Sequence, residues 1–177
     1  VAFFFLVWDV IFTKMGVWGF NPRYHVDLIV FGLPLEEILF FICIPYASIF
    51  THYAVGYFFP KLQLSEKVTG SITIVLFLIS VVVLILNTDK WYTLINFSVF
   101  AGLLAYSFFA KNTILQKFYL TFLVILIPFF IVNGILTGSF IHQEVVWYND
   151  NENLGIRLFT VPVEDAFYAF SMLFANL

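Results

Sequence analysis

Long stretches of apolar residues, separated by short polar segments, are the feature that most limits what this chain can fold into. A helix needs about 20 mostly apolar residues to cross a bilayer. The stretches lack the alternation that strands of a membrane barrel show. The sequence therefore predicts an all-α, polytopic bundle of transmembrane helices with about six spans, at residues 1–13, 28–59, 69–86, 91–110, 118–137 and 156–177.

The composition agrees with this fold class and excludes several others. Of the 177 residues, 62% are hydrophobic and 11% are charged, against roughly 25% charged in a typical soluble domain. A water-soluble globule of this size could not bury so much apolar surface. The net charge of −3 argues against a nucleic-acid partner, and the single cysteine, Cys43, permits no internal disulfide. We expect an integral, multi-pass protein of the cell membrane, with both terminal spans incomplete in this sequence.

Several residues predict details of the spans. The second stretch is too long for one straight helix, and Gly32 and Pro34 predict a break or re-entrant turn near its start. Pro128 predicts a kink in the fifth span. Aromatic residues near the span ends favour an interpretation as anchors at the membrane surface, and these are Trp18, Trp91, Trp147 and Tyr148.

One pattern occurs twice along the chain. Residues 9–13 (DVIFT) end the first span, a loop with Trp18 follows, and then comes Pro34-Leu35-Glu36-Glu37. Residues 133–137 (NGILT) end the fifth span, a loop with Trp147 follows, and then comes Pro162-Val163-Glu164-Asp165. We interpret this as an internal duplication.

The duplication divides one membrane domain into residues 1–60 as the first repeat, 61–117 as connecting spans, and 118–177 as the second repeat. The copies are offset by an even number of spans. Both acidic motifs should therefore enter the membrane from the same side, as in a parallel repeat.

The acidic pairs are the candidate catalytic residues: Glu36, Glu37, Glu164 and Asp165. Inserting one charged group at the bilayer centre costs about 2.5 to 3.5 kcal/mol, so intramembrane acids are functional by default. An alternative is that Pro-x-Glu-Glu only starts a helix, because Pro suits the first position and acids in the first turn favour the helix dipole. One residue can serve both purposes.

Other residues near the acids are candidates for binding a substrate. Asp9 occupies the position equivalent to Asn133, and either contributes a polar contact inside the bundle or takes part in the substrate site. Aromatic residues three or four positions after a carboxylate share its helix face, and these are Phe40, Phe41, Phe167 and Tyr168. His52 has no second histidine at ligand spacing, so no metal site is expected.

The duplicated Pro-x-Glu-Glu/Asp motif resembles that of the cofactor-independent membrane lycopene cyclases, which consist of two small subunits or of both halves fused in one chain. The runs Gly16–Pro22 (GVWGFNP) and Leu154–Asp165 (LGIRLFTVPVED) are also similar to the fused form. The family's acidic residues correspond to Glu36, Glu37, Glu164 and Asp165. The resemblance implies closure of β-ionone rings on lycopene, without redox change and without a cofactor. It also implies a linear carotenoid substrate, surrounding membrane lipid, and other carotenoid enzymes as candidate partners.

The residues suit the chemistry that this resemblance implies. A carboxylic acid in an apolar cavity can stay protonated at neutral pH and act as a general acid. A partner carboxylate could take the final proton, and aromatic faces could stabilise the intermediate cation. The alternative function is a proton-coupled transporter or channel with duplicated midplane acids. A prenyl-transferring enzyme would need aspartate-rich Mg²⁺ sites, which the sequence lacks, and a structural subunit would leave the repeated acids unexplained.

Overall fold

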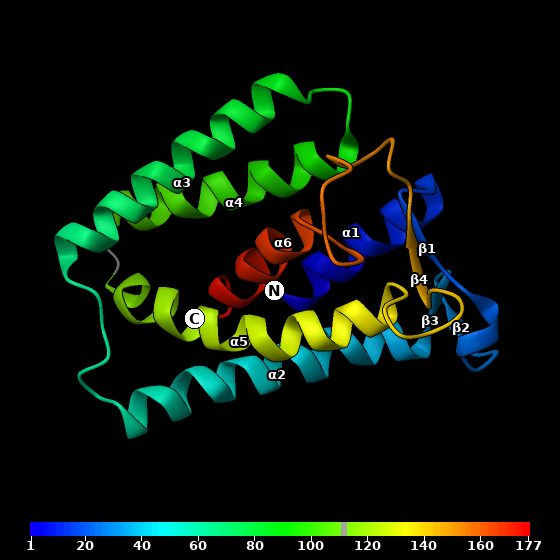
Figure 1. Ribbon diagram of the computed structural model, residues 1–177, viewed down its shortest axis with the longest axis horizontal. Helices are drawn as coiled ribbons and strands as arrows, with labels where there is room; N and C mark the ends of the chain where they lie inside the picture. The colour runs from blue at the N-terminus through cyan, green and yellow to red at the C-terminus, as the bar shows by residue number, and fades with distance from the viewer. Residues whose placement is uncertain (111–112) are drawn as a thin grey trace.

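The computed structural model describes residues 1–110 and 113–177, and this part of the chain is mainly helical (Figure 1). It contains six α-helices: α1 (Ala2–Met15), α2 (Leu35–Phe58), α3 (Glu66–Leu86), α4 (Trp91–Phe109), α5 (Ile114–Leu136) and α6 (Glu164–Phe174). Within the described residues, the four helices from α2 to α5 are long and apolar enough to cross a membrane. The chain is therefore a membrane protein, as its hydropathy predicts.

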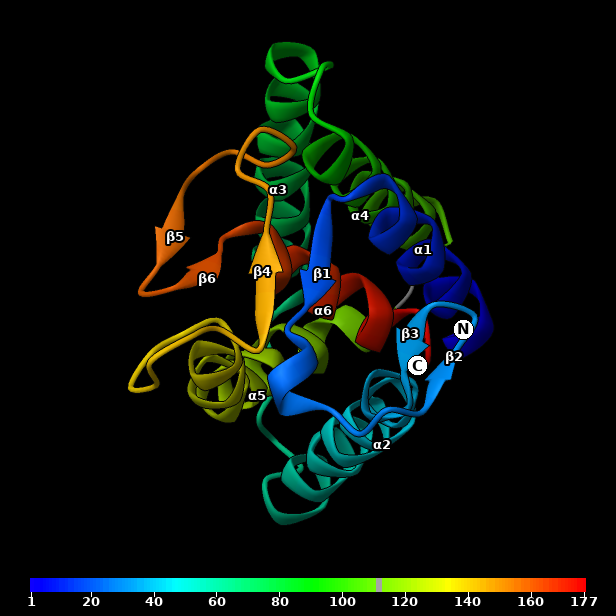
Figure 2. The same ribbon diagram turned by 90° about the vertical axis from the view of Figure 1, so that its right-hand side faces the viewer.

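Short strands and the 3₁₀ turn Pro22–Tyr24 gather at one end of the bundle. The strands form three antiparallel pairs: β1 (Trp18–Phe20) with β4 (Val146–Tyr148), β2 (Ile29–Val30) with β3 (Leu33–Pro34), and β5 (Arg157–Leu158) with β6 (Val161–Pro162). The β1–β4 pair joins segments that are about 130 positions apart, with Trp18 opposite Tyr148. It thus connects the two predicted repeats directly, as Figure 2 shows from the loop end.

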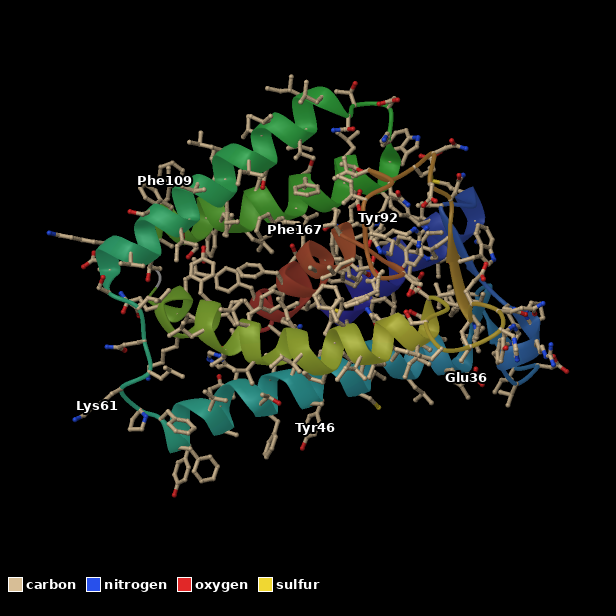
Figure 3. The ribbon with its side chains drawn as sticks, in the orientation of Figure 1. Glu36, Tyr46, Lys61, Tyr92, Phe109 and Phe167 are labelled. Atoms are coloured by element: carbon tan, nitrogen blue, oxygen red, sulfur yellow. The ribbon has the colours of Figure 1, made fainter. Side chains whose placement is uncertain are left out.

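Helix α6 lies inside the bundle, with α4 on one side and α5 and α2 on the other (Figure 1). Phenylalanine rings fill the space around it. One core cluster joins α4, α5 and α6 through residues such as Phe100, Phe118 and Phe170. A second cluster joins α1, β1 and the start of α4 through Phe5, Trp8 and other aromatic side chains. The outward faces remain apolar, with Tyr46 and Phe109 exposed (Figure 3), as expected for surfaces in contact with lipid.

The predicted boundaries of the second and sixth spans are wrong at their N-terminal ends. Residues 28–34 and 156–162 are β-hairpins rather than helix, and the helices begin only at Leu35 and Glu164. The break predicted at Gly32 and Pro34 is confirmed. Gly32 has φ of 94°, a conformation that ends regular structure and suits glycine. Hydropathy alone could not distinguish an apolar hairpin from the first turns of an apolar helix.

Candidate active site

An apolar cavity of about 200 Å³ lies between α2, α5 and α6 and ends beneath the β1–β4 pair. An apolar cavity of about 150 Å³ in another protein binds benzene, so this cavity has room for an organic group. Apolar and aromatic side chains form most of its wall, and three acidic side chains enter it at the loop end: Asp9, Glu37 and Asp165. Exposed wall residues of α2 and α5, such as Ala47 and Val132, open the cavity towards the surface that faces lipid.

Asp165 is held by two tyrosines from different parts of the chain. It lies in the first turn of α6 and is only 5% exposed. The Tyr92 hydroxyl, from α4, donates to Oδ1 at 2.5 Å, and the Tyr148 hydroxyl, from β4, donates to Oδ2 at 2.9 Å. Hydrogen bonds of this kind favour a charged carboxylate and fix its orientation.

Tyr148 remains a hydrogen-bond donor over the whole physiological range. Burial raises the pKa of its hydroxyl well above the usual value, and the neighbouring charge of Asp165 raises that pKa further. Its ring stacks at 6.0 Å from that of Tyr92. The Arg157 guanidinium lies 5.8 Å from the centre of the Tyr148 ring, a cation–π contact that helps to hold the ring in place.

Asp9 is also fixed by hydrogen bonds. Its Oδ1 accepts from the indole nitrogen of Trp18 at 2.6 Å and from the Thr13 hydroxyl at 3.4 Å. The side chain is 1% exposed, and its other oxygen has no partner among the described residues. Asp9 therefore both makes a contact inside the bundle and lines the cavity, so the two alternatives left open by the sequence are compatible.

Glu37 differs from both aspartates. Its carboxyl group lines the cavity, yet no hydrogen bond reaches it from residues 1–110 or 113–177. Asp9 and Asp165 line the same cavity. A carboxyl group without donors, in apolar surroundings and near two other acids, is costly to ionise.

The first acid of each pair lies outside the cavity wall and holds a loop. Glu36 Oε1 accepts from the backbone N–H of Val26 at 2.9 Å, and Glu164 Oε1 accepts from the backbone N–H of Leu154 at 2.7 Å. Each hydrogen bond joins residues ten positions apart, and the hairpin that precedes the helix lies between them. Glu164 also accepts from the Thr93 hydroxyl at 2.8 Å.

The remaining predicted site residues divide in the same way. Asn133, Phe40, Phe41 and Tyr168 line the cavity with the acids. Tyr168 follows Asp165 by one helical turn, its ring lies 4.8 Å from that of Trp8, and its buried hydroxyl has no partner in the described part of the chain. Phe167 instead faces α4, where its ring packs 4.7 Å from that of Phe97 (Figure 3).

Sequence reasoning missed three residues of the site. Trp18 and Tyr148 were predicted to be anchors at the membrane surface, but this is wrong, because both bind a cavity carboxylate. Tyr92 at the start of α4 was not singled out. Each of the three lies on a different element from the acid to which it donates. The spacing of residues within one helix therefore could not predict these contacts. Only the repeated tryptophan loop pointed towards this region.

These features define a membrane protein with an acid-bearing apolar cavity, a site suited to a hydrophobic substrate and to proton transfer. The sequence matches the family described as lycopene cyclase over residues 1–55 and 89–177, and the chain belongs to this family. Membership makes it a cyclase of carotenoid synthesis and implies a linear carotenoid substrate and a membrane environment. No curated protein and no solved structure matches the chain.

Proposed function

We propose that the protein is a lycopene β-cyclase that closes β-ionone rings by proton transfer inside the apolar cavity. The observation that carries this proposal is the contrast between its carboxyl groups: Glu37 has no hydrogen-bond donor in the described chain, whereas Asp165 has two. One acid is thereby suited to release a proton and the other to accept one.

In the proposed reaction, Glu37 protonates the terminal double bond of the linear substrate and becomes a carboxylate. A new C–H bond forms, and the positive charge moves to the adjacent tertiary carbon. The neighbouring double bond attacks this carbon and closes the ring. Asp165 then removes a ring proton, and the electrons of that C–H bond form the ring double bond. One proton enters and one leaves, so the reaction is an isomerisation that consumes no reductant.

The surroundings of the acids support a cationic intermediate. The rings of Trp18, Phe41 and Tyr168 line the cavity beside the carboxyl groups, and aromatic faces stabilise a cation by about 2 kcal/mol when water is excluded. The apolar walls also protect the cation from hydration. The side opening between α2 and α5 suits a substrate that arrives from the lipid.

The other members of the acidic pairs serve as positioning residues in this proposal. Glu36 and Glu164 hold the hairpins that set where α2 and α6 begin. This fixes the direction in which Glu37 and Asp165 point. The protein would act as a multi-pass protein of the cell membrane, with other carotenoid enzymes as partners that supply lycopene.

Carotenoid analysis in a host that produces lycopene tests this proposal. Chromatography should show γ-carotene or β-carotene with the wild-type chain, and mainly lycopene with Glu37→Gln or Asp165→Asn. Wild-type yields of cyclic product from both variants would contradict the assignment. Uptake of protons into liposomes without any carotenoid product would favour the transporter alternative.

A further inference from the structure

Three phenylalanines have a backbone conformation that normally belongs to glycine. In the described part of the chain, the residues with positive φ other than glycine are Phe31 (56°), Phe140 (67°) and Phe159 (58°). Bulky residues rarely adopt this conformation, because the side chain approaches the backbone too closely. Three independent turns each carry the same unfavourable choice, so the aromatic side chain must serve a purpose there.

All three rings point away from the protein. Phe31 is 82% exposed, Phe159 is 82% exposed and Phe140 is 99% exposed. Phe31 and Phe159 occupy the same place in the two hairpins, directly after β2 and β5, and Phe140 lies in the loop that follows α5. None of them contributes to a core cluster. A role in internal packing therefore cannot account for them.

The hairpins present further apolar residues beside the phenylalanines. Leu28 and Ile29 are exposed on the first hairpin, and Ile156 and Leu158 are exposed on the second. The first hairpin leads into α2, where Leu39 and Ile42 are also exposed, on a face that meets lipid in a membrane helix. Exposed apolar patches of this kind mark contact with a membrane or a partner.

The charge of Arg157, in strand β5 beside the tip of the second hairpin, is paired. The Arg157 guanidinium binds the Asp150 carboxylate and also donates to the Thr160 carbonyl at 2.8 Å. Thr160 belongs to the turn itself, so the guanidinium lies beside the tip with its charge paired by Asp150. Phe159 is the exposed side chain of this turn, and the aliphatic stem of a paired arginine beside it suits the boundary between lipid and water.

We propose that Phe31, Phe140 and Phe159 insert into the lipid layer and anchor the loop end of the bundle in the membrane surface. Figure 2 shows the β5–β6 hairpin and the loop after α5 on one side of the central β1–β4 pair and the β2–β3 hairpin on the other. Anchors on two sides would hold the loop end of the bundle at the membrane surface. The acid cavity directly beneath would then lie within the hydrophobic layer, where a carotenoid end can reach it.

The single cysteine makes a direct test possible. In a Cys43→Ser background, the full chain would carry one new cysteine at position 31, 140 or 159 (Phe→Cys), labelled with a fluorophore sensitive to polarity. Gln143→Cys, exposed three residues from Phe140, is the matched control, and Lys61→Cys marks the opposite end of the molecule (Figure 3). Each labelled protein is reconstituted into phosphatidylcholine liposomes.

We expect blue-shifted emission from the labels at the three tips. Lipids with a nitroxide on the upper acyl chain should quench these labels strongly. Aqueous iodide should quench them at least about threefold more weakly than it quenches the label at position 143. Iodide quenching equal to that of the control would overturn the proposal. Protection from both quenchers would also overturn it, in favour of a second copy or another protein covering the tips. If a tip variant misfolds, Ile29→Cys and Leu158→Cys report on the same hairpins from strand positions.

Discussion

The two acidic pairs share their local structure and differ in what surrounds them. Glu36 and Glu164 each accept a backbone N–H from ten positions earlier, and each follows a hairpin. Glu36 is nevertheless exposed, whereas Glu164 is fully buried and also receives the Thr93 hydroxyl. The Asn96 side chain donates to the Glu164 carbonyl as well. The second pair is thus built into the bundle, and the first lies at its edge.

The second acids show the same contrast. Asp165 receives Tyr92 and Tyr148, while Glu37 receives no donor from any described residue. The cause is packing, because α4 lies along α6 and supplies Tyr92, Thr93 and Asn96 to the second half. A duplicated motif therefore acquires two different chemical environments from one unduplicated helix.

The largest expected effect separates Glu37 from its neighbour Glu36. Glu37→Gln removes the proposed acid and should lower the rate of cyclisation by about 10²-fold or more. Glu36→Gln keeps an oxygen that can accept a hydrogen bond from the Val26 N–H, so its rate of cyclisation should stay within a few-fold of the wild-type rate. Initial rates on lycopene in liposomes measure both, and equal losses in the two variants would contradict the division of roles.

Stability should separate Glu164 from Glu36. Glu164→Ala leaves the buried Thr93 hydroxyl and the partly buried Leu154 N–H without an acceptor, so it should lower the free energy of unfolding by about 1–3 kcal/mol. Glu36→Ala removes one exposed hydrogen bond and should cost less than about 1 kcal/mol. Thermal unfolding of both variants in one detergent compares them, and a larger loss for Glu36→Ala would reverse the expected order.

The tyrosines that hold Asp165 should matter individually. Tyr92→Phe and Tyr148→Phe each remove one hydrogen bond to a carboxylate, worth about 1.5–3 kcal/mol, so each should lower kcat roughly 10- to 100-fold. Tyr46→Phe, on the outward face of α2, is the control and should leave kcat unchanged. The pH profile of kcat should also shift in the two site variants, which a purely structural loss would not produce.

The contact between the halves at β1 and β4 should tolerate little change. A Cβ added at Gly19 would clash with the Trp147 ring, whereas one added at Gly56 meets nothing within 4 Å. Gly19→Ala should therefore destabilise the fold by about 1–3 kcal/mol through overpacking, and Gly56→Ala should not. Thermal unfolding distinguishes them, and an unchanged Tm for Gly19→Ala would show that Trp147 moves aside freely.

The smallest expected effect concerns the Arg157–Asp150 ion pair of the second half. Hydrogen bonding from Arg157 lowers the pKa of Asp150 below its usual value, and Ile29 takes the place of Arg157 in the first hairpin. A carboxyl group whose pKa is lower in the folded than in the unfolded protein stabilises the fold at pH values above the unfolded pKa. This contribution is lost as the pH falls below about 4. Because the pair is largely exposed, Asp150→Asn should cost less than about 0.5 kcal/mol at neutral pH. The free energy of unfolding should differ less between pH 7 and pH 3.5 in the variant than in the wild type.

The fold class and the location of the acids follow from the sequence alone. Apolar stretches locate the helices, because a helix in lipid must satisfy its own backbone hydrogen bonds, but they do not fix the starts of α2 and α6, which lie seven and eight residues later than predicted. The repeated motif also pointed to Glu37 and Asp165, and the helical spacing of three or four residues placed Phe41 and Tyr168 near them. These are local relations, and a single chain displays them directly.

The tertiary structure alone decided which acids face the cavity and which hydrogen bonds they receive. Glu36 and Glu37 are adjacent and chemically alike, so nothing in their order distinguishes a residue that holds a loop from one that lines the cavity. The donors to Asp165 come from 73 and 17 positions away, and Trp18 reaches Asp9 only because the chain reverses after α1. Protonation depends on such neighbours in space, and these exist only once the helices have packed.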